Sequence, residues 1–449
     1  MALLIWPDAV GMTALAVTGA IAVPIALLWF ARSPRAAIIA MIVASATPRL
    51  AINIGGLNAR PEHIVGGLML LTVPFLRKKQ GQQAAWIASD YWLLGYIFFN
   101  FFSSLFMSVQ PGQTTKWAAQ QVLAILPYFL LRFLITDRAR LRWAFQVLLI
   151  VGTATVSYAV ICFYANVAFG TELGVETAQY GDIPATFGLQ YEANILGAFS
   201  GALAVMMLAM YIQERKTKYL VGFSCIGLVA MGASLSRAAL GATLVGLALV
   251  GIYGLMRHLL NGKAIRSIAL ATVFAGLMIG PFVLSHYTER FSTVEIADPT
   301  ADPNTMTRAV QTFSAFDEIL SHPFFGGGTA SFQLAFDWES LGAGWEDQGW
   351  IGNTELRVLH DTGVAGLIVF AGFVVSLVWN GWKALRRQSG PELVALLASA
   401  CVYLISFQAT EGTLLSFTWV HLGLIGCALS LFHKAHESEE KTFAEASAT

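Results

Sequence analysis

The sequence consists largely of apolar runs, each about as long as a helix that crosses a membrane. Such a helix needs about 20 mostly apolar residues. Charged residues make up only 12% of the chain, whereas they make up about 25% of an average soluble domain. The sequence therefore predicts an all-α polytopic membrane protein with about 12–13 transmembrane helices. The candidate spans are residues 11–31, 36–54, 63–76, 91–107, 117–135, 143–169, 193–212, 219–235, 238–256, 267–285, 363–382, 393–409 and 414–432.

The connections between these runs predict the orientation. Six of them are basic, and all six fall on one side of the membrane when the spans alternate. Because positively charged connections tend to stay in the cytoplasm, that side is predicted to be cytoplasmic. The basic connections are residues 32–35, 77–79, 138–142, 215–218, 257–266 and 383–387.

The spans divide the chain into four predicted parts. Residues 1–286 form an N-terminal transmembrane bundle of about ten spans. Residues 287–362 form a large extracytoplasmic loop. Residues 363–433 form the C-terminal spans. Residues 434–449 form a cytoplasmic tail, which is expected to be disordered because it is polar.

The loop is the long polar stretch of the chain. It is expected to contain a helix at 305–320, a glycine turn at 321–328 and a second helix at 352–363 that runs into the next span. Helical spacing gives the first helix two different faces. The apolar face consists of Val310, Phe313, Phe316 and Leu320. The opposite face consists of Arg308, Gln311 and Ala315.

Neither the cysteines nor the glycines indicate a metal or nucleotide site. All four cysteines lie inside apolar runs, and no Cys/His cluster has the spacing of a metal site. The glycines at 326–328 lack the Lys-Ser/Thr ending of a phosphate-binding loop, so a turn is favoured. The formal net charge of +0 gives no reason to expect nucleic acid. No metal and no cofactor are therefore expected.

Two arginines are candidates for binding an anionic substrate. Arg237 lies between two apolar runs in a very short connection, where a charge is costly unless it is paired or faces water. Arg308 lies on the first loop helix, in an acidic stretch with few other cations. A guanidinium suits a phosphate because it can donate two parallel hydrogen bonds. The alternatives are an interfacial anchor for Arg237 and a solvated surface side chain for Arg308.

Acidic and imidazole side chains on the predicted extracytoplasmic side are candidates for proton transfer. A general base must lie within hydrogen-bond reach of the hydroxyl that it deprotonates. For each residue alone, a solvated loop charge or a helix cap is the alternative. The candidates are Glu192, Glu355, His360, Asp361 and Glu411.

Four short motifs follow one another between residues 184 and 366. The first is the stretch 185–194, which ends in Asn194 at the start of a span, and the second is Ser236-Arg237. The third is Arg308 followed by Ser321-His322-Pro323-Phe324-Phe325-Gly326-Gly327-Gly328. The fourth is Asn353, then nine residues, then Gly363-Val364-Ala365-Gly366. In this combination the chain resembles the O-antigen ligase and O-antigen polymerase superfamily, bacterial membrane glycosyltransferases that use undecaprenyl-diphosphate-linked glycans.

The resemblance implies a mechanism. Arg237 and Arg308 would bind the donor diphosphate, and Arg49 and Lys116 are further candidates for this role. The acceptor hydroxyl would attack the anomeric carbon and invert it, without a metal or a cofactor. Other expected site residues are Asn194, Glu192, His322 and Asn353.

The resemblance also implies partners and a location. The partners are an undecaprenyl-diphosphate-linked oligosaccharide, a glycan acceptor and membrane lipid, with a chain-length regulator as a further candidate and no nucleic acid. The location is the bacterial inner membrane, with the active face in the periplasm.

One position departs from the family pattern. Gly352 stands where ligases have the histidine of a His-Asn pair, which is proposed to act on the acceptor. The expected activity is therefore that of a polymerase of O-antigen, exopolysaccharide or capsule, with its base among Glu355, His360 and Asp361. A ligase that transfers the glycan to lipid A-core or another acceptor is the alternative. A transporter or flippase is a third hypothesis, which is disfavoured because the charges cluster at the outer rim.

Overall fold

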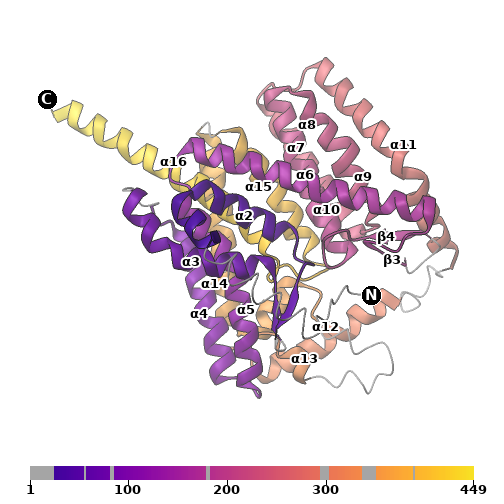
Figure 1. The fold of residues 1–449 in the computed structure, drawn as a ribbon, viewed down its shortest axis with the longest axis horizontal. Helices are drawn as coiled ribbons and strands as arrows, with labels where there is room; N and C mark the ends of the chain where they lie inside the picture. Colours follow the sequence, from indigo (N-terminus) through magenta and orange to yellow (C-terminus); the bar gives the residue numbers. More distant parts are fainter. Residues whose placement is uncertain are drawn as a thin grey trace. The chain divides into compact units, whose positions relative to one another are not determined.

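The computed structural model describes residues 25–54, 57–80, 85–177, 183–293, 303–335, 350–387 and 390–448 (Figure 1). The protein is an all-α polytopic membrane protein. Its helical elements are α2 (Pro34–Ala46), α3 (Pro61–Gln80), α4 (Ala88–Phe106), α5 (Pro111–Leu134), α6 (Arg138–Phe169), α7 (Ala193–Glu214), α8 (Thr217–Val221), the π-helix η1 (Gly222–Leu228), α9 (Val229–Ala233), α10 (Arg237–Met256), α11 (Gly262–Thr293), α12 (Pro303–Ser321), α13 (Phe332–Ala335), α14 (Thr354–Arg386), α15 (Pro391–Ser406) and α16 (Ser416–Ala448).

Within the described ranges, seven helices are long and apolar enough to cross a membrane, namely α5, α6, α7, α10, α11, α14 and α16. Further predicted spans coincide with shorter apolar helical stretches at Pro34–Ala46, Pro61–Val73, Thr217–Ala233 and Pro391–Ser406. The predicted span at 91–107 coincides with α4. The predicted span at 11–31 begins outside the described residues. The number of spans and their orientation stay predictions.

Two short antiparallel hairpins accompany the helices. β1 (Ile52–Ile54) pairs with β2 (Leu57–Ala59), and β3 (Val175–Thr177) pairs with β4 (Pro184–Thr186). β4 is buried and contacts α7 and α9. The chain after β4 leads directly into α7, so this hairpin positions the residues in front of that helix.

The chain divides into two compact units. The first consists of Met1–Ala85, Leu123–Val151 and Leu415–Thr449, and the second consists of Trp86–Val122 and Gly152–Leu414. This division differs from the four predicted parts because helices that are distant in sequence pack together. The four parts follow the expected membrane topology and stay a prediction.

In the first unit, α2 packs against α3 and α16. The buried Arg132 side chain, on α5, donates hydrogen bonds to the carbonyl oxygens of Gly426 (2.9 Å) and Ala85 (2.7 Å). A buried guanidinium needs such partners because its desolvation is costly. Arg132 therefore ties α5, α16 and the chain before α4 together. One of the basic candidates, Arg49, also belongs to this unit.

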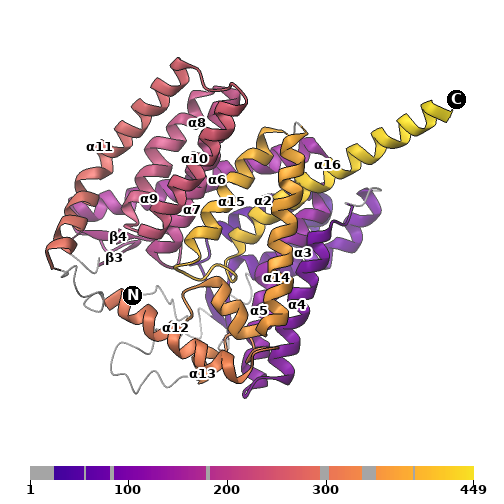
Figure 2. The ribbon, with the colours of Figure 1, turned by 180° about the vertical axis from the view of Figure 1, so that it is seen from behind.

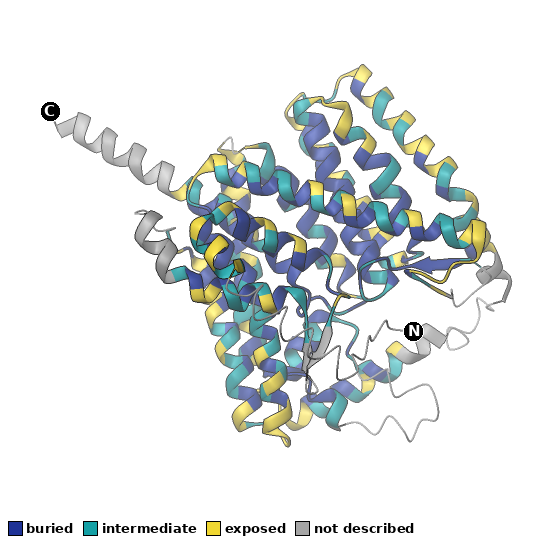
Figure 3. Cartoon of the chain, viewed as in Figure 1, coloured by how far each residue is buried: buried dark blue, intermediate teal, exposed yellow. Residues whose placement is uncertain are grey.

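The second unit is built around α7, which Figure 3 colours largely as buried. The apolar part of α7 is wholly buried, and α10, α15, η1 and α9 pack against it. Small residues allow this close packing, since a Cβ added to Gly201 would lie 2.1 Å from Oγ1 of Thr243. Packing through small residues is typical of helices inside membranes. In the same unit, α4 packs along α14 (Figure 2).

α12 confirms the helix predicted at 305–320. The protein covers its less apolar face, where Gln311 and Ala315 are buried and Ala315 packs in a small core with Phe332 and Ile351. The exposed side chains of the other face include Phe313, Phe316 and Leu320. The two faces therefore have the predicted composition, but the apolar one faces away from the protein, unlike in a helix that packs by its apolar stripe.

α14 contains a kink where the glycine turn after α12 binds to it. Gly363 has φ 66° and ψ −170°, a conformation that glycine adopts most easily. Just beyond it, the amide of Val364 donates to the carbonyl of Pro323 (2.9 Å) and the amide of Ala365 donates to that of Phe324 (3.1 Å). A Cβ on Gly363 would lie 2.3 Å from the carbonyl carbon of Phe324, so only glycine fits here.

The end of the same turn binds α14 just before the kink. The amides of Gly327 and Gly328 donate to the carbonyls of His360 and Asp361, each over 3.0 Å. A Cβ on Gly326, whose φ is 70°, would lie 2.5 Å from the carbonyl carbon of Asp361. We call this set of backbone contacts between residues 323–328 and α14 the clasp. It confirms the predicted glycine turn and the predicted helix that runs into the next span.

The polar end of the chain differs from its prediction. Residues 434–449 were expected to be disordered, but α16 continues to Ala448. The reason is local composition, because this stretch is rich in Ala, Glu and Lys, which favour a helix.

Candidate functional site

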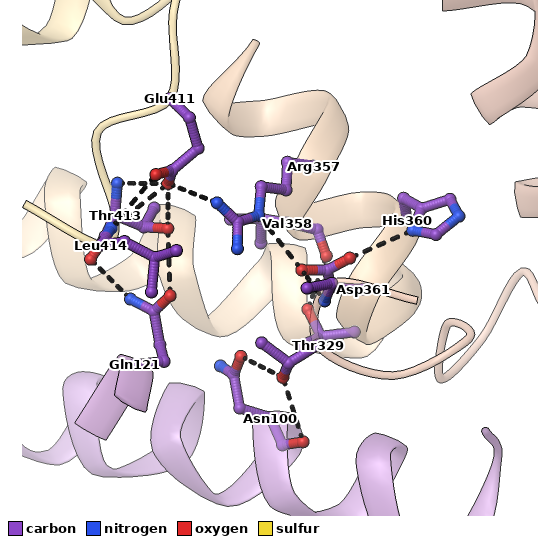
Figure 4. Close-up of polar contacts among 12 residues, drawn as sticks. Asn100, Gln121, Thr329, Arg357, Val358, His360, Asp361, Glu411, Thr413 and Leu414 are labelled. Atoms are coloured by element: carbon purple, nitrogen blue, oxygen red, sulfur yellow. Dashed lines mark hydrogen bonds and ion pairs between the residues drawn. The ribbon is translucent and has the colours of Figure 1, made fainter. Parts of the chain in front are cut away.

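A buried arginine lies between two carboxylates at the start of α14 (Figure 4). Nε of Arg357 lies 3.3 Å from Oδ2 of Asp361, and Nη1 lies 2.9 Å from Oε1 of Glu411. The guanidinium also stacks over the ring of Trp350, 4.9 Å from its centroid. Only 3% of the Arg357 side chain is exposed. A charge this deeply buried is tolerated only when it is paired, so these contacts depend on one another.

His360 and Asp361 are both buried and have several partners. Oδ2 of Asp361 accepts a hydrogen bond from the amide of Ala330 (3.0 Å). Nδ1 of His360 lies 3.1 Å from Oδ1 of Asp361, and its Nε2 lies 2.7 Å from Oε2 of Glu318 on α12. These bonds connect α12, the segment after the clasp, and α14. We refer to Arg357, Asp361, His360, Glu318 and Glu411 as the Arg357 network.

Side chains of α4 also form hydrogen bonds to residues of this network and to Thr329 beside it. Oγ of Ser103 donates to the carbonyl of Asp361 (2.7 Å). Oγ1 of Thr329 donates to Oδ1 of Asn100 (3.0 Å), and the amide of Thr329 donates to Oγ of Ser104 (3.0 Å). All of these side chains are buried. The network is therefore bonded on several sides and held in one arrangement.

Glu411 orders the segment that follows α15. Its carboxylate accepts hydrogen bonds from the hydroxyl and the amide of Thr413 and from the amide of Leu414 (3.3 Å). Nε2 of Gln121, on α5, donates to the carbonyl of Thr413 (2.6 Å). Glu411 thus joins this segment to Arg357 on α14.

A second polar group lies at the beginning of α14 and is more accessible. Oδ1 of Asn353 accepts a hydrogen bond from the amide of Leu356 (2.8 Å) and so caps the helix. Its Nδ2 donates to Oε1 of Gln408 (2.9 Å), and Nε2 of Gln408 donates to Oε2 of Glu355 (2.6 Å). Gln408 is exposed and Glu355 is half-buried.

Gly352 leaves room for a side chain beside this group. A Cβ at this position would lie 3.6 Å from Oε1 of Gln311 and 4.0 Å from the carbonyl oxygen of Ala409. These are ordinary van der Waals distances. The position of the family histidine therefore faces α12 on one side and the segment after α15 on the other, and nothing in the backbone forbids a side chain.

Glu192 and Arg308, both predicted site residues, interact with each other. Oγ1 of Thr410 donates a hydrogen bond to Oε1 of Glu192. Burial raises the pKa of Glu192, whereas the Thr410 bond and the charge of Arg308 act to lower it, and Glu411 acts to raise it. Arg308 is exposed. We refer to Arg308, Glu192, Asn353, Glu355 and Gln408 as the open edge.

The remaining predicted residues have varied positions. Arg237 is the first residue of α10 and is exposed, and the side chain of Ser236 caps this helix. Lys116 is exposed on α5, and Asn194 is half-buried in the first turn of α7. His322 is exposed, with Nδ1 2.8 Å from Oγ of Ser321. Their participation in one site with the open edge stays a prediction.

Three residues that organise this region, Arg357, Gln408 and Thr410, are not among the predicted site residues. Arg357 and Asp361 are four residues apart on one helix, a spacing typical of ion pairs, so this contact had a visible signal. Gln408 and Thr410 had none, because they meet α14 and Glu192 through a segment distant in sequence. In the described part of the chain, no three His, Cys, Asp or Glu side chains form a group that could hold a metal ion.

The fold and this region define a class of protein. It is a helical multi-pass membrane protein that carries a polar, arginine-containing site between α12, the start of α14 and the segment after α15. Residues 222–371 match the Wzy_C family model, described as O-antigen ligase, and this match supports the O-antigen ligase and polymerase superfamily. The match runs from η1 into α14 and includes Arg237, Arg308 and the clasp.

The matching family gives general functional information. Members of this family are glycosyltransferase-like enzymes, whose substrates are a lipid-linked glycan and an acceptor. No curated protein matches the chain.

Proposed function

We propose that this protein is a polysaccharide polymerase. It transfers undecaprenyl-diphosphate-linked repeat units of an O-antigen, exopolysaccharide or capsule to a sugar hydroxyl, on the outer face of the bacterial inner membrane. The observation that carries this proposal is the open edge. There Thr410 donates to the carboxylate of Glu192, the charge of Arg308 acts to lower the pKa of that carboxyl, and the neighbouring Ala409 borders the room left by Gly352. Such a site offers a cation for a leaving group and a carboxylate for an acceptor.

The donor is held by arginines. Arg308 and Arg237 bind the diphosphate of the lipid-linked glycan, because a guanidinium donates two parallel hydrogen bonds to phosphate oxygens. Lys116 provides further positive charge, and His322 and Asn194 contact the donor or its glycan. Arg49 stays a candidate for donor binding. The positive charge stabilises the diphosphate as its bond to the sugar breaks, without a metal.

Glu355 is the best candidate for the base. It is half-buried and accepts a hydrogen bond from Gln408. His360 and Asp361 stay candidates, but each would have to leave partners in the Arg357 network. In the proposed step, Glu355 takes the proton of the acceptor hydroxyl, and the oxygen attacks the anomeric carbon. The carbon–oxygen bond to the diphosphate breaks, and the lipid diphosphate leaves as an anion.

A ligase is the second candidate function, and the description of the matching family favours it. The two functions differ in the acceptor, which is another glycan repeat for a polymerase and lipid A-core for a ligase. Gly352 favours the polymerase because the histidine that ligases use on their acceptor is missing here.

The test uses purified protein in lipid, with a diphosphate-linked oligosaccharide of the native repeat unit. A ladder of longer glycans without added acceptor would support the polymerase. Transfer only after addition of a core lipid would identify a ligase and contradict our proposal. The absence of product in both reactions, from protein that remains folded, would contradict both.

A further inference from the structure

We infer that the aromatic face of α12, together with the turn that follows it, lies in the interfacial layer of a phospholipid bilayer. This face consists of Phe313, Phe316, Leu320 and Phe324, which we call the aromatic face. Phe313 is 71% exposed and Leu320 is 76% exposed. This inference does not rest on the proposed function, because it concerns the surface opposite to the open edge.

The orientation of α12 is fixed by its other face. Ala315 is fully buried in a core with Phe332 and Ile351. Oε2 of Glu318 is bonded to Nε2 of His360 (2.7 Å). A rotation that buried the aromatic face against the protein would break both contacts. The residues that cover the other face of α12 therefore cannot also cover the aromatic face, which is left for a different contact.

The turn after α12 packs against α4, a predicted span, and against α14. The ring of Phe325 packs against Phe99 (6.3 Å between centroids) and Phe102 (5.2 Å) on α4. The exposed side chains Phe98, Leu105 and Phe106 lie on the same helix. Through the clasp, the backbone of this turn also pairs with α14, which is long and apolar enough to cross a membrane. The turn is thus at the depth where α14 enters the bilayer.

Position and composition both favour lipid as the occupant. α12 runs obliquely to α4 and α14 rather than along them (Figure 2), as expected for a helix that lies on a membrane surface. Aromatic side chains are enriched at this interface. Polar groups border the aromatic face, since Asp317, Ser321 and His322 are exposed. Such a mixture fits the boundary between headgroups and acyl chains better than the hydrocarbon core.

A depth measurement with spin labels tests this inference. Phe313→Cys and Leu320→Cys would each be labelled with a nitroxide in the full chain, in vesicles of phosphatidylethanolamine and phosphatidylglycerol. Relaxation by oxygen reports contact with lipid, and relaxation by a water-soluble nickel chelate reports contact with water. We expect oxygen to be more effective than the chelate at both positions.

Controls make the result decisive. Glu172→Cys, at an exposed polar position after α6, should give the opposite order, and the unsubstituted protein with its four cysteines gives the background. If either variant does not fold, Phe324→Cys replaces it. Chelate access equal to that at position 172 would overturn the inference. Low access to both reagents would also overturn it, because a second copy or another protein would then cover the face.

Discussion

The Arg357 network and the open edge both include residues at the start of α14, but their charged groups differ in how far they are buried and paired. In the network, every charged group has a charged partner and the arginine, the histidine and Asp361 are almost wholly buried. In the open edge, Arg308 and Gln408 are exposed, and Glu355 and Glu192 are half-buried. A buried network of paired charges gives rigidity. Groups that bind a substrate must be able to exchange water for ligand. Of these two groups of residues, the open edge has that property.

The largest expected effect follows from breaking the network. Arg357→Ala would leave the buried Asp361 and the half-buried Glu411 without their cation, and breaking a buried ion pair costs about 3–5 kcal/mol in comparable cases. We expect a large fall in melting temperature, measured on purified protein in lipid. Arg386→Ala, at an exposed position on the same helix, is the matched control and should change little. Equal melting temperatures for the two variants would show that the network does not stabilise the fold.

The next effect concerns the cation of the open edge. Arg308→Ala should lower kcat about 10²–10³-fold, as loss of a transition-state donor does, and should leave the melting temperature unchanged because Arg308 is exposed. Arg308→Lys keeps the charge but loses the paired hydrogen bonds. Full activity in the lysine variant would mean that charge alone suffices. Near-normal activity in the alanine variant would remove Arg308 from the mechanism.

A third prediction separates the base candidates. Glu355→Gln should lower kcat about 100-fold if Glu355 is the general base, with little loss of stability. Asp361→Asn should instead lower the melting temperature, because it weakens the pair with Arg357. Normal turnover in Glu355→Gln would exclude Glu355 as the base. A stable but inactive Asp361→Asn variant would make Asp361 the better candidate.

The smallest expected effect is a change in pH dependence. Because the pKa of Glu192 is raised in the folded protein, its proton stabilises the fold below the ordinary pKa of glutamate. This contribution is lost as the pH rises through the raised pKa. The glutamine of Glu192→Gln cannot titrate. As the pH rises from the ordinary pKa of glutamate through the raised pKa of Glu192, the melting temperature of this variant should therefore fall less than that of the original protein. Parallel curves for the two proteins would contradict the assignment.

The sequence predicted the elements of this region better than their burial. α12 and the helix that becomes α14 appear where helical spacing, the cap Asn353 and the glycine turn place them. The burial of α12 was not predictable, because the rule that apolar faces turn inward assumes water outside. Beside a bilayer an apolar face can turn outward, and the pattern alone does not distinguish the two cases.

The site was predictable only in part, because some of its contacts join segments that are distant in sequence. Spacing along one helix is sufficient to pair Arg357 with Asp361. No local pattern brings Glu411 to Arg357 or Thr410 to Glu192, since both come from the segment after α15. Such contacts depend on how α14 and α7 each pack against α15, and glycines on α7 such as Gly201 allow part of that packing.

The clasp has a consequence for how chains of this kind can diversify. Its contacts are between backbones, and they fasten the chain at residues 328 and 363. The chain leaves the clasp after Gly328 and returns to it at His360, and doubling the length of a loop whose ends are held costs only about 0.6 kcal/mol. Insertions between Ala335 and Trp350 can therefore accumulate while Arg308 and the Arg357 network keep their places. A lineage of such proteins can lengthen the chain there without rebuilding the contacts beneath it.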